Sequence, residues 1–353
     1  MTLKVAIIAD DLTGALDTGT PFVDAGLSVA VAIEIEAIED ALATGCEVAV
    51  VNTASRALPE GEAARRAGLA ASALLAAHPD IVLKKIDSRL KGNVAAESAA
   101  IAAIFGHREV AVAPAIPDQE RFTRDGHVVG RGVEVPLSVA ALFDGSADRV
   151  VIADASSDAD LDQLVSAHDW TTTLAVGARG LGSAFARHLR RGRGSVTAFD
   201  PARNTLFAFG SRDPITGAQM ARLEASGSLR ASIAAPMGAL DQTEALDLPA
   251  LLCCTGDISE DAVAVADRFA RGVRSAIERT HPDMLMVGGG DTALAVFRAL
   301  GVRTLLPKGE IEAGIPWFDV TAADGRHFRC AVKSGGFGKP DSLLRLISQN
   351  QAA

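Results

Sequence analysis

The sequence has 353 residues, of which 48% are hydrophobic and 22% are charged, and its net charge is −10. These values indicate roughly two globular domains. The acidic balance argues against nucleic acid or an anionic membrane surface as the main partner, because both require a basic face. No apolar run reaches the ~18 residues of a membrane span, and the N-terminal residues lead into an expected strand rather than a signal peptide. We therefore expect a cytoplasmic protein.

Short apolar runs alternate with longer Ala-rich segments through the first half of the chain. The apolar runs predict strands at 5–9, 29–33, 48–51, 81–83, 110–113 and 150–153. Ala-rich segments at 60–77 and 93–104 predict helices between them. Polar residues and glycines break this rhythm over 114–136, which favours a loop with a hairpin. The alternation is typical of a parallel sheet flanked by helices.

A basic, glycine-rich stretch at 190–195 has the composition of a domain linker. The strand and helix rhythm then restarts. Strands are predicted at 205–209, 251–254 and 284–287, and helices at 214–224, 261–274 and 292–300. We therefore predict two α/β domains, each with a largely parallel sheet flanked by helices, over residues 1–195 and 204–353.

The first candidate site is the segment Ala-Asp-Asp-Leu-Thr-Gly at 9–14, which directly follows a predicted strand. Parallel sheets bind ligands outside the carboxyl ends of their strands. There, Asp10 and Asp11 could orient a hydroxyl, accept its proton or hold a metal ion. The alternative is that one Asp only caps the next helix, with Thr13 as its partner. Three acids within eight positions, Asp17 included, favour a functional site.

A cationic turn at 84–93, Lys-Lys-Ile-Asp-Ser-Arg-Leu-Lys-Gly-Asn, follows another predicted strand. Arg89 can bind a carboxylate through two parallel hydrogen bonds, and Lys91 adds positive charge. Gly92 and Asn93 stand at the start of a helix, where backbone N–H groups favour anions. The alternative is a solvated charged turn that Asn93 caps.

Two glycine-rich turns in the second half could cradle phosphate, because glycine lets the backbone approach closely. The alternative is a tight turn with an ordinary Asp cap, for which one glycine would be enough. Neither turn fits G-x-x-x-x-G-K-[ST] or G-x-G-x-x-G. The strand-to-helix turn at Ser211 is a weaker candidate of the same kind. The candidate residues at the two glycine turns are Gly288, Gly289, Gly290, Asp291, Thr292, Gly335, Gly336 and Gly338.

Taken together, these segments resemble the four-carbon acid sugar kinase family, formerly a domain of unknown function, which includes threonate, erythronate and 3-oxotetronate kinases. Five segments are similar to family motifs and come in the same order, at 9–15, 87–93, 114–127, 288–293 and 333–338. The resemblance covers essentially the whole chain. Some features depart from the usual pattern. Arg89 stands where Thr is usual, and Arg212-Asp213 stand where small residues are usual. The loop after Gly126-His127 and the interval between Ser211 and Gly288 are shorter than in the family.

The resemblance implies an N-terminal domain that binds a sugar acid, a C-terminal domain that binds ATP, and an active site in the cleft between them. It implies substrate contacts at Asp10, Asp11, Arg89, Gly92 and Asn93. It implies nucleotide contacts at Ser211, Gly288 to Asp291 and Gly335 to Gly338. The residues by themselves agree with this division, since the paired acids and the cationic turn lie in the first half and the glycine turns in the second.

Our hypothesis is transfer of the γ-phosphoryl group of Mg·ATP to the terminal hydroxyl of a short sugar acid. Asp11 or Asp10 would orient or deprotonate that hydroxyl, and Asp291 would lie near the Mg²⁺ ion. Arg89, with Lys91, would bind the carboxylate of the substrate. The sequence identifies no protein ligand set for a metal, because its histidines and cysteines lack ligand spacing.

Two other functions fit the same scaffold. One is an NAD-dependent sugar-acid dehydrogenase, which the missing dinucleotide fingerprint disfavours. The other is a non-catalytic sugar-acid sensor, which the intact Asp11 and glycine turns disfavour. The sequence leaves open which sugar acid is bound, which Asp is the base, and the oligomeric state, a homodimer included.

Overall fold

The computed structural model describes residues 3–145, 149–191, 197–240, 246–256 and 261–347. The chain divides into two compact units, Met1–Val196 and Thr197–Ala353. Most of the predicted linker at 190–195 lies outside the described residues. No helix in the described ranges has the length and apolar composition needed to cross a membrane.

The first unit is built on a sheet whose central strands are buried on both faces. Neighbouring strands all run parallel, and such strands require continuous apolar runs. The prediction of a parallel sheet is confirmed, but β10 was missed. In spatial order, the strands are β2 (Val29–Ala32), β3 (Val48–Asn52), β1 (Val5–Ala9), β4 (Ile81–Lys85), β10 (Thr173–Gly177), β5 (Glu109–Ala113) and β9 (Arg149–Ile152).

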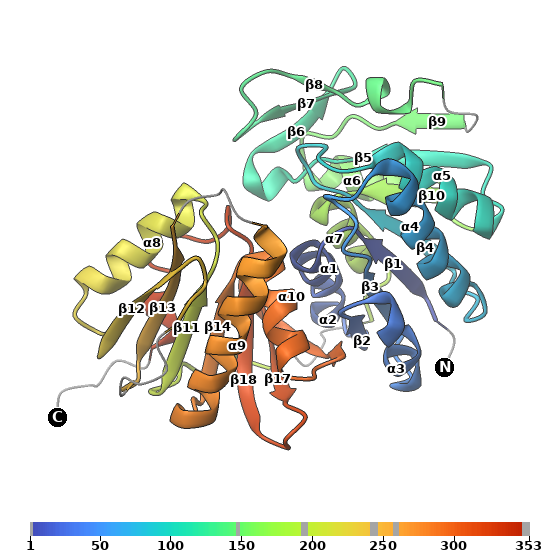
Figure 1. Ribbon diagram of the computed structural model, residues 1–353. Coiled ribbons are helices and arrows are strands. Elements are labelled where there is room, and N and C mark those ends of the chain that lie inside the picture. The colour runs from blue at the N-terminus through green and yellow to red at the C-terminus, as the bar shows by residue number, and fades with distance from the viewer. Residues whose placement is uncertain (1–2, 146–148, 192–196, 241–245, 257–260, 348–353) are drawn as a thin grey trace. The chain divides into compact units, whose positions relative to one another are not determined.

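Helices cover both faces of this sheet (Figure 1). Alanine and leucine side chains of α3 (Ile38–Ala43), α4 (Glu60–Leu75) and α5 (Val94–Phe105) join one hydrophobic cluster with the strands. The other group packs together on the opposite face and consists of α1 (Leu12–Gly19), α2 (Pro21–Asp24), α6 (Asp158–Ala167) and α7 (Arg179–His188). Small alanine side chains let these helices approach the strands closely, which suits a chain with only 4% aromatic residues.

The segment predicted as a loop with a hairpin does contain one. Strands β6 (Arg121–Arg124) and β7 (His127–Gly130) pair antiparallel, and β8 (Leu137–Ser138) pairs with β7. By its pairing this small sheet is separate from the main sheet, and an isolated bridge joins Thr123 of β6 to Ala155 after β9. Within the described residues, short 3-10 turns form η1 (Ile35–Ala37), η2 (Pro117–Gln119), η3 (Ala140–Phe143) and η4 (Leu344–Leu346).

The second unit has a mixed sheet. Its strands follow the order β12 (Ala231–Pro236), β13 (Ala250–Thr255), β11 (Thr205–Phe209), β14 (Met284–Gly288), β18 (His327–Lys333), β17 (Ile315–Thr321) and β16 (Pro307–Glu312). The first five run parallel, whereas β17 and β16 are antiparallel additions at one side. A largely parallel sheet is confirmed, but sequence analysis missed β12, β16, β17 and β18, which lack the simple apolar-run pattern.

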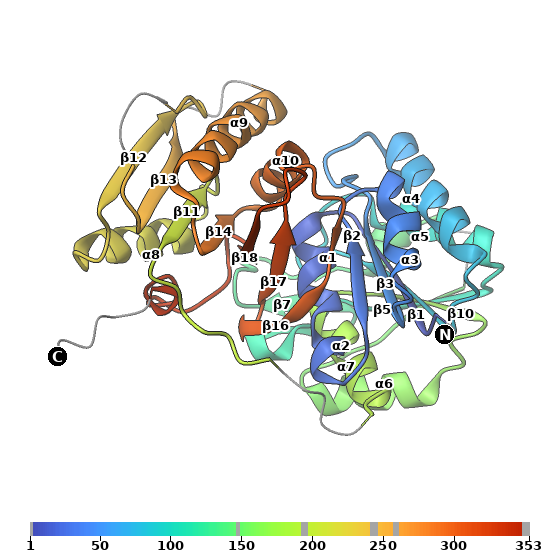
Figure 2. The same cartoon turned by 90° about the horizontal axis from the view of Figure 1, so that it is seen from below.

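The helices α8 (Pro214–Ala225), α9 (Ala262–Thr280) and α10 (Gly290–Ala299) accompany this sheet, and the short strand β15 (Thr304–Leu305) follows α10. Figure 2 shows α8 and α9 on opposite sides of the strands. Phe207 and Phe209 of β11 pack with Leu223 of α8 and Trp317 of β17 in one cluster. The parallel strands therefore end together at one edge, where β11, β14 and β18 each lead into a glycine turn.

A buried ion pair lies within the first unit. Lys84 near the end of β4 pairs with Glu97 of α5, and both side chains are almost fully buried. Glu97 also accepts a hydrogen bond from Ser55, whose hydroxyl lies 2.7 Å from that of Thr53. Burying one charge without its partner is strongly unfavourable, so each member depends on the other.

Replacing Glu97→Ala should therefore destabilise the first unit by about 3–5 kcal/mol, because the Lys84 ammonium would stay buried without a carboxylate. Chemical unfolding followed by circular dichroism measures this loss. The matched control is Glu62→Ala, which removes an exposed pair with Arg65 and should change stability little. Equal stability of the two variants would contradict the role given to the buried pair.

Candidate active site

Three strands of the first unit deliver charged side chains to one edge of the sheet. Asp10 and Asp11 follow β1, Arg56 follows β3, and Asp87 follows β4. The Arg56 guanidinium binds both oxygens of Asp10, at 2.9 and 2.8 Å, and one oxygen of Asp11, at 2.7 Å. Its remaining nitrogen lies 3.9 Å from Asp87. The structure thus joins the predicted acids through Arg56, which sequence analysis missed. The available signal was an arginine four residues past a buried strand.

Asp11 is both a helix cap and a member of this cluster. Its Oδ1 accepts the backbone N–H of Gly14 at 3.0 Å, and its Oδ2 accepts the Thr13 hydroxyl at 2.5 Å. Asp11 therefore caps α1, as the alternative interpretation predicted. The same carboxylate also belongs to the charged cluster, so the cap does not exclude a function for it. Its side chain is 17% exposed, whereas that of Asp10 is 3% exposed. Asp11 is thus the more accessible carboxylate of the two.

The environment of Asp10 favours its ionised form. Burial raises the pKa of Asp10, but the nearby charges of Lys84, Arg56 and Lys85 outweigh it, so the pKa lies below its usual value. A carboxylate with a lowered pKa is a weaker proton acceptor. Asp10 is therefore better suited to stay ionised and position Arg56 than to accept a proton from a substrate.

Lys85 brings a second buried lysine to this edge, on the opposite face of β4 from Lys84. Its ammonium lies 3.9 Å from Asp17 of α1, whose pKa burial raises against the opposing charges of Lys85 and Arg179. A side chain on Gly14 would begin 2.4 Å from the Asp11 carboxylate and 2.7 Å from the Lys85 ammonium. Because Gly14 has no side chain, the first turn of α1 packs directly against both charges.

The cationic turn after β4 reaches the same cluster. Gly92 has a φ of 92°, and a side chain there would begin 3.0 Å from Asp10. Asn93 precedes α5 but makes no capping bond; its amide donates instead to the carbonyl of Leu58 at 2.9 Å. The capping alternative for Asn93 is therefore wrong. Arg89 and Lys91 are exposed on this turn.

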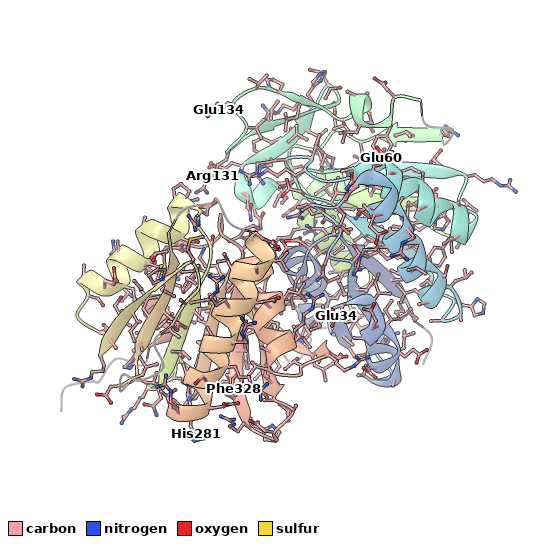
Figure 3. The ribbon with its side chains drawn as sticks, viewed as in Figure 1. Glu34, Glu60, Arg131, Glu134, His281 and Phe328 are labelled. Carbon is pink, nitrogen blue, oxygen red and sulfur yellow. The ribbon has the colours of Figure 1, made fainter. Side chains whose placement is uncertain are left out.

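Arg121 of β6 adds a third cation beside Arg89. Its guanidinium donates to the Ser88 hydroxyl and, at 3.1 and 3.0 Å, to the carbonyl of Arg131, a residue of the loop after β7 labelled in Figure 3. Burial lowers the pKa of Arg121, and the neighbouring charges of Arg89 and Arg131 lower it further, against the opposing charge of Asp87. An anion bound beside Arg121 would offset these neighbouring positive charges.

Three turns of the second unit converge at the ends of β11, β14 and β18. The Gly210 amide donates to the carbonyl of Gly288 at 3.1 Å, and that of Gly289 donates to the carbonyl of Lys333 at 3.0 Å. A side chain on Gly335 would begin 2.7 Å from the Ser211 hydroxyl. The structure therefore brings together the three segments in which nucleotide contacts were predicted.

The second of these turns begins α10. Gly288 ends β14, and Gly289, with a φ of 103°, is the N-cap and provides no side-chain cap. The helix starts at Gly290 rather than at Thr292 as predicted, so Asp291 lies in the first turn and does not cap it. Backbone N–H groups of an uncapped first turn favour anions.

A preformed metal cluster is absent from the described parts of the chain, since no three His, Cys, Asp or Glu side chains there are grouped to hold an ion. Mg²⁺ bound to a nucleotide needs only one or two protein carboxylates, because phosphates and waters supply its other ligands. Asp291, exposed in the first turn of α10, is a carboxylate of the required type at the glycine turns.

Comparison with known proteins matches both halves of the chain. Residues 5–141 match a family model described as a sugar-binding N-terminal domain, and residues 252–343 match one described as a nucleotide-binding C-terminal domain. The chain is 27% identical to the D-threonate kinase of Bordetella bronchiseptica, over 97% of this chain and 96% of that protein. It is 28% identical to the 3-oxo-tetronate kinase of Methylobacterium radiotolerans, over 98% of this chain and 99% of that protein.

The fold also matches a solved structure. A Haemophilus influenzae protein, assigned to a domain of unknown function, superposes with a TM-score of 0.67 at 19% identity. The match covers 97% of this chain and 98% of that protein. At this identity the likeness supports the fold, and it extends over both units.

Arg56→Met should raise the pKa of Asp10, because it removes one of the charges that keep this carboxylate ionised. A lowered folded-state pKa gives stability that is present above the ordinary value of 3.8 and is lost as the pH falls through the folded-state pKa. The variant should therefore begin to lose this stability at a higher pH than the wild type. Acid titration followed by circular dichroism measures the shift.

The control for this titration is Arg65→Met. Arg65 is an exposed arginine that pairs with Glu62 on the surface of α4. Its removal should leave the acid transition in place. If Arg56→Met and the wild type had the same acid transition, Arg56 would not be what lowers the pKa of Asp10.

Proposed function

Because this chain belongs to the four-carbon acid sugar kinase family and is a sugar-acid kinase, we propose that it transfers the γ-phosphoryl group of Mg·ATP to the terminal hydroxyl of a four-carbon sugar acid. Threonate, erythronate and 3-oxotetronate are the candidate substrates. The observation that carries the proposal is the Asp10–Arg56–Asp11 cluster at the strand ends of one unit. The glycine turns at the strand ends of the other unit complement it.

The two units have separate roles in this proposal. Residues 1–195 bind the sugar acid, and residues 204–353 bind the nucleotide. The matching family models support this division, since one is described as sugar-binding and the other as nucleotide-binding. Because donor and acceptor bind to different units, transfer requires a conformation that brings the two together.

Arg89 binds the carboxylate of the sugar acid, with Arg121 beside it and Lys91 on the same turn. An acidic protein with a net charge of −10 needs such a local group of cations to attract an anionic substrate. The proximity of Arg89 to Arg121 supports this assignment, because burial and then the like charge of Arg89 lower the pKa of Arg121, and an anion would offset that charge. Gly92 and Asn93 complete the turn that faces the substrate.

Asp11 is the general base in this mechanism. It is the more exposed carboxylate of the pair, whereas the lowered pKa of Asp10 makes Asp10 a weak proton acceptor. Asp10 orients the substrate and fixes Arg56. The terminal hydroxyl gives its proton to Asp11, and its oxygen forms a bond to the γ-phosphorus. The bond from that phosphorus to the β,γ-bridging oxygen breaks, and ADP leaves.

The phosphates of the nucleotide are bound by backbone N–H groups of the three convergent turns. The uncapped start of α10 contributes N–H groups at Gly290 and Asp291, and Gly335 and Gly336 contribute others. Ser211 and Thr292 line the same turns, as the close approach of Gly335 to Ser211 and of Gly210 to Thr292 indicates. Mg²⁺ on the phosphates would neutralise their charge, with Asp291 as its protein carboxylate.

The proposal is tested by measuring ADP release from ATP with threonate, erythronate and 3-oxotetronate, each as separate stereoisomers. We expect turnover with one or a few of these acids and with no neutral sugar of the same length. A protein that binds the acids without releasing ADP would be the non-catalytic sensor, and one that reduces NAD with them would be the dehydrogenase. Either result would overturn the proposal.

Asp11→Asn should lower kcat by ~10² or more while nucleotide binding is retained, because the variant lacks the proton acceptor. Steady-state kinetics and nucleotide titration measure the two effects separately. The control is Asp80→Asn, an exposed acid just before β4 at the opposite edge of the sheet. Unchanged turnover in Asp11→Asn would assign the base elsewhere.

Arg89→Met should raise KM for the sugar acid by roughly 10- to 100-fold, the value of a charge-assisted hydrogen bond, and leave KM for the nucleotide unchanged. Initial rates with each substrate varied in turn separate the two constants. Arg108→Met, at the start of β5 and away from the strand ends, is the control. An equal rise of both KM values would show that Arg89 does not recognise the acid specifically.

A further inference from the structure

Lys333 at the end of β18 is fully buried beneath the glycine-rich loop that follows it. Its ammonium donates to the Thr216 hydroxyl at 2.8 Å, and to the carbonyls of Ser334 and Gly335 at 3.0 and 3.1 Å. An ammonium has three N–H donors, so all three are used inside the protein. In the P-loop, by contrast, a lysine reaches out to the phosphate as a point charge. Lys333 has neither the exposure nor a remaining donor for that contact.

Two side chains of α8 hold the same loop. The Thr216 hydroxyl donates to the Gly335 carbonyl at 2.8 Å. The Gln219 amide donates to the carbonyls of Phe337 and Lys339, at 3.2 and 2.8 Å. Thr216 and Gln219 are themselves buried. With Lys333, these side chains engage four carbonyls of the loop from one side.

In contrast to these carbonyls, some backbone N–H groups of the loop are not bound within the described part of the protein. Among the described residues, the structure records no acceptor for the backbone N–H groups of Gly335 and Gly336. Gly335 lies against Ser211 and Asp213, where any side chain would collide. Successive backbone N–H groups with no internal partner form the concave anion sites known as nests.

We propose that Lys333 is a positioning residue of the nucleotide site: with Thr216 and Gln219 it binds the carbonyls of the loop at 334–339, so that the amides of Gly335 and Gly336 are presented to a nucleotide phosphate. The inference rests on the proposed function, and it assigns phosphate recognition in this loop to the backbone rather than to the lysine charge. Lys333 acts through the loop and does not touch the phosphate.

This arrangement makes nucleotide binding sensitive to pH. Burial lowers the pKa of Lys333 to about 8, against the attraction of its charged neighbours Asp213, at the start of α8, and Glu312, at the end of β16. A neutral amine keeps two N–H groups and cannot donate to three acceptors. Above pH 8 the loop carbonyls are therefore held less completely, and the affinity for nucleotide should fall.

The effect of Lys333 on global stability has the opposite sign. Its folded-state pKa of about 8 lies below the ordinary 10.5, so the unfolded chain binds more protons between these values. The contribution of Lys333 to stability therefore rises with pH in this window. A fall in nucleotide affinity above pH 8 would thus not reflect unfolding caused by this group.

The test is titration calorimetry of the full-length protein with ADP and with ATP, below and above pH 8. Wild-type affinity should fall as the pH passes through the pKa of Lys333. Lys333→Met should bind each nucleotide ~10-fold or more weakly at every pH, with no step near pH 8. Gln219→Leu keeps the lysine charge but frees two carbonyls, so it should bind ~3- to 10-fold more weakly and keep the step.

Lys308→Met, which removes an exposed lysine of β16, is the control and should behave as wild type. Normal binding in Gln219→Leu with a loss in Lys333→Met would indicate direct contact between the lysine and the phosphate and overturn the inference. A wild-type affinity that is flat across pH 8 would also overturn it, and that measurement needs no variant to fold. If the wild type binds neither nucleotide, the proposed function fails and this inference fails with it.

Discussion

One guanidinium group allows two adjacent carboxylates to stand together at the end of a buried strand. Asp10 and Asp11 would repel each other at the end of β1 if Arg56 did not bind both. The strand must be apolar to lie inside the sheet, so the charges can only collect where it ends. The residues that we propose to bind the substrate lie around this point, because parallel strands bind ligands outside their carboxyl ends, which share one edge of the sheet.

The strand next to β1 shows how the sheet supports this edge with charge. Lys84 and Lys85 are neighbours in sequence, but the alternation of side chains places them on opposite faces of β4. Lys84 is neutralised by Glu97 of α5 within the layer of helices. Lys85 lies against α1, close to Asp17 and Asp11. Both positive charges lower the pKa of Asp10, one from each face of the sheet.

At the strand ends of the second unit, glycine turns take the place of the charged side chains found in the first unit. These three turns rely on glycine, because Gly210, Gly288 and Gly335 leave room for the side chains of Thr292, Phe209 and Ser211. Lys333, at the end of β18, is buried and bound to carbonyls. A fully buried ammonium needs all three of its donors satisfied. That requirement links the end of β18 to α8.

The sequence by itself determined the two α/β domains, most of the parallel strands, and the segments that hold the site, because buried strands and glycine turns leave local patterns. It also raised an Asp cap on the next helix as an alternative to a functional site, and Asp11 makes that contact. Only the tertiary structure decided that Arg56 joins the acids, that Asn93 does not cap its helix, and that Lys333 is enclosed. These facts depend on residues far apart in the chain that meet at a strand end, and no local pattern records such a meeting.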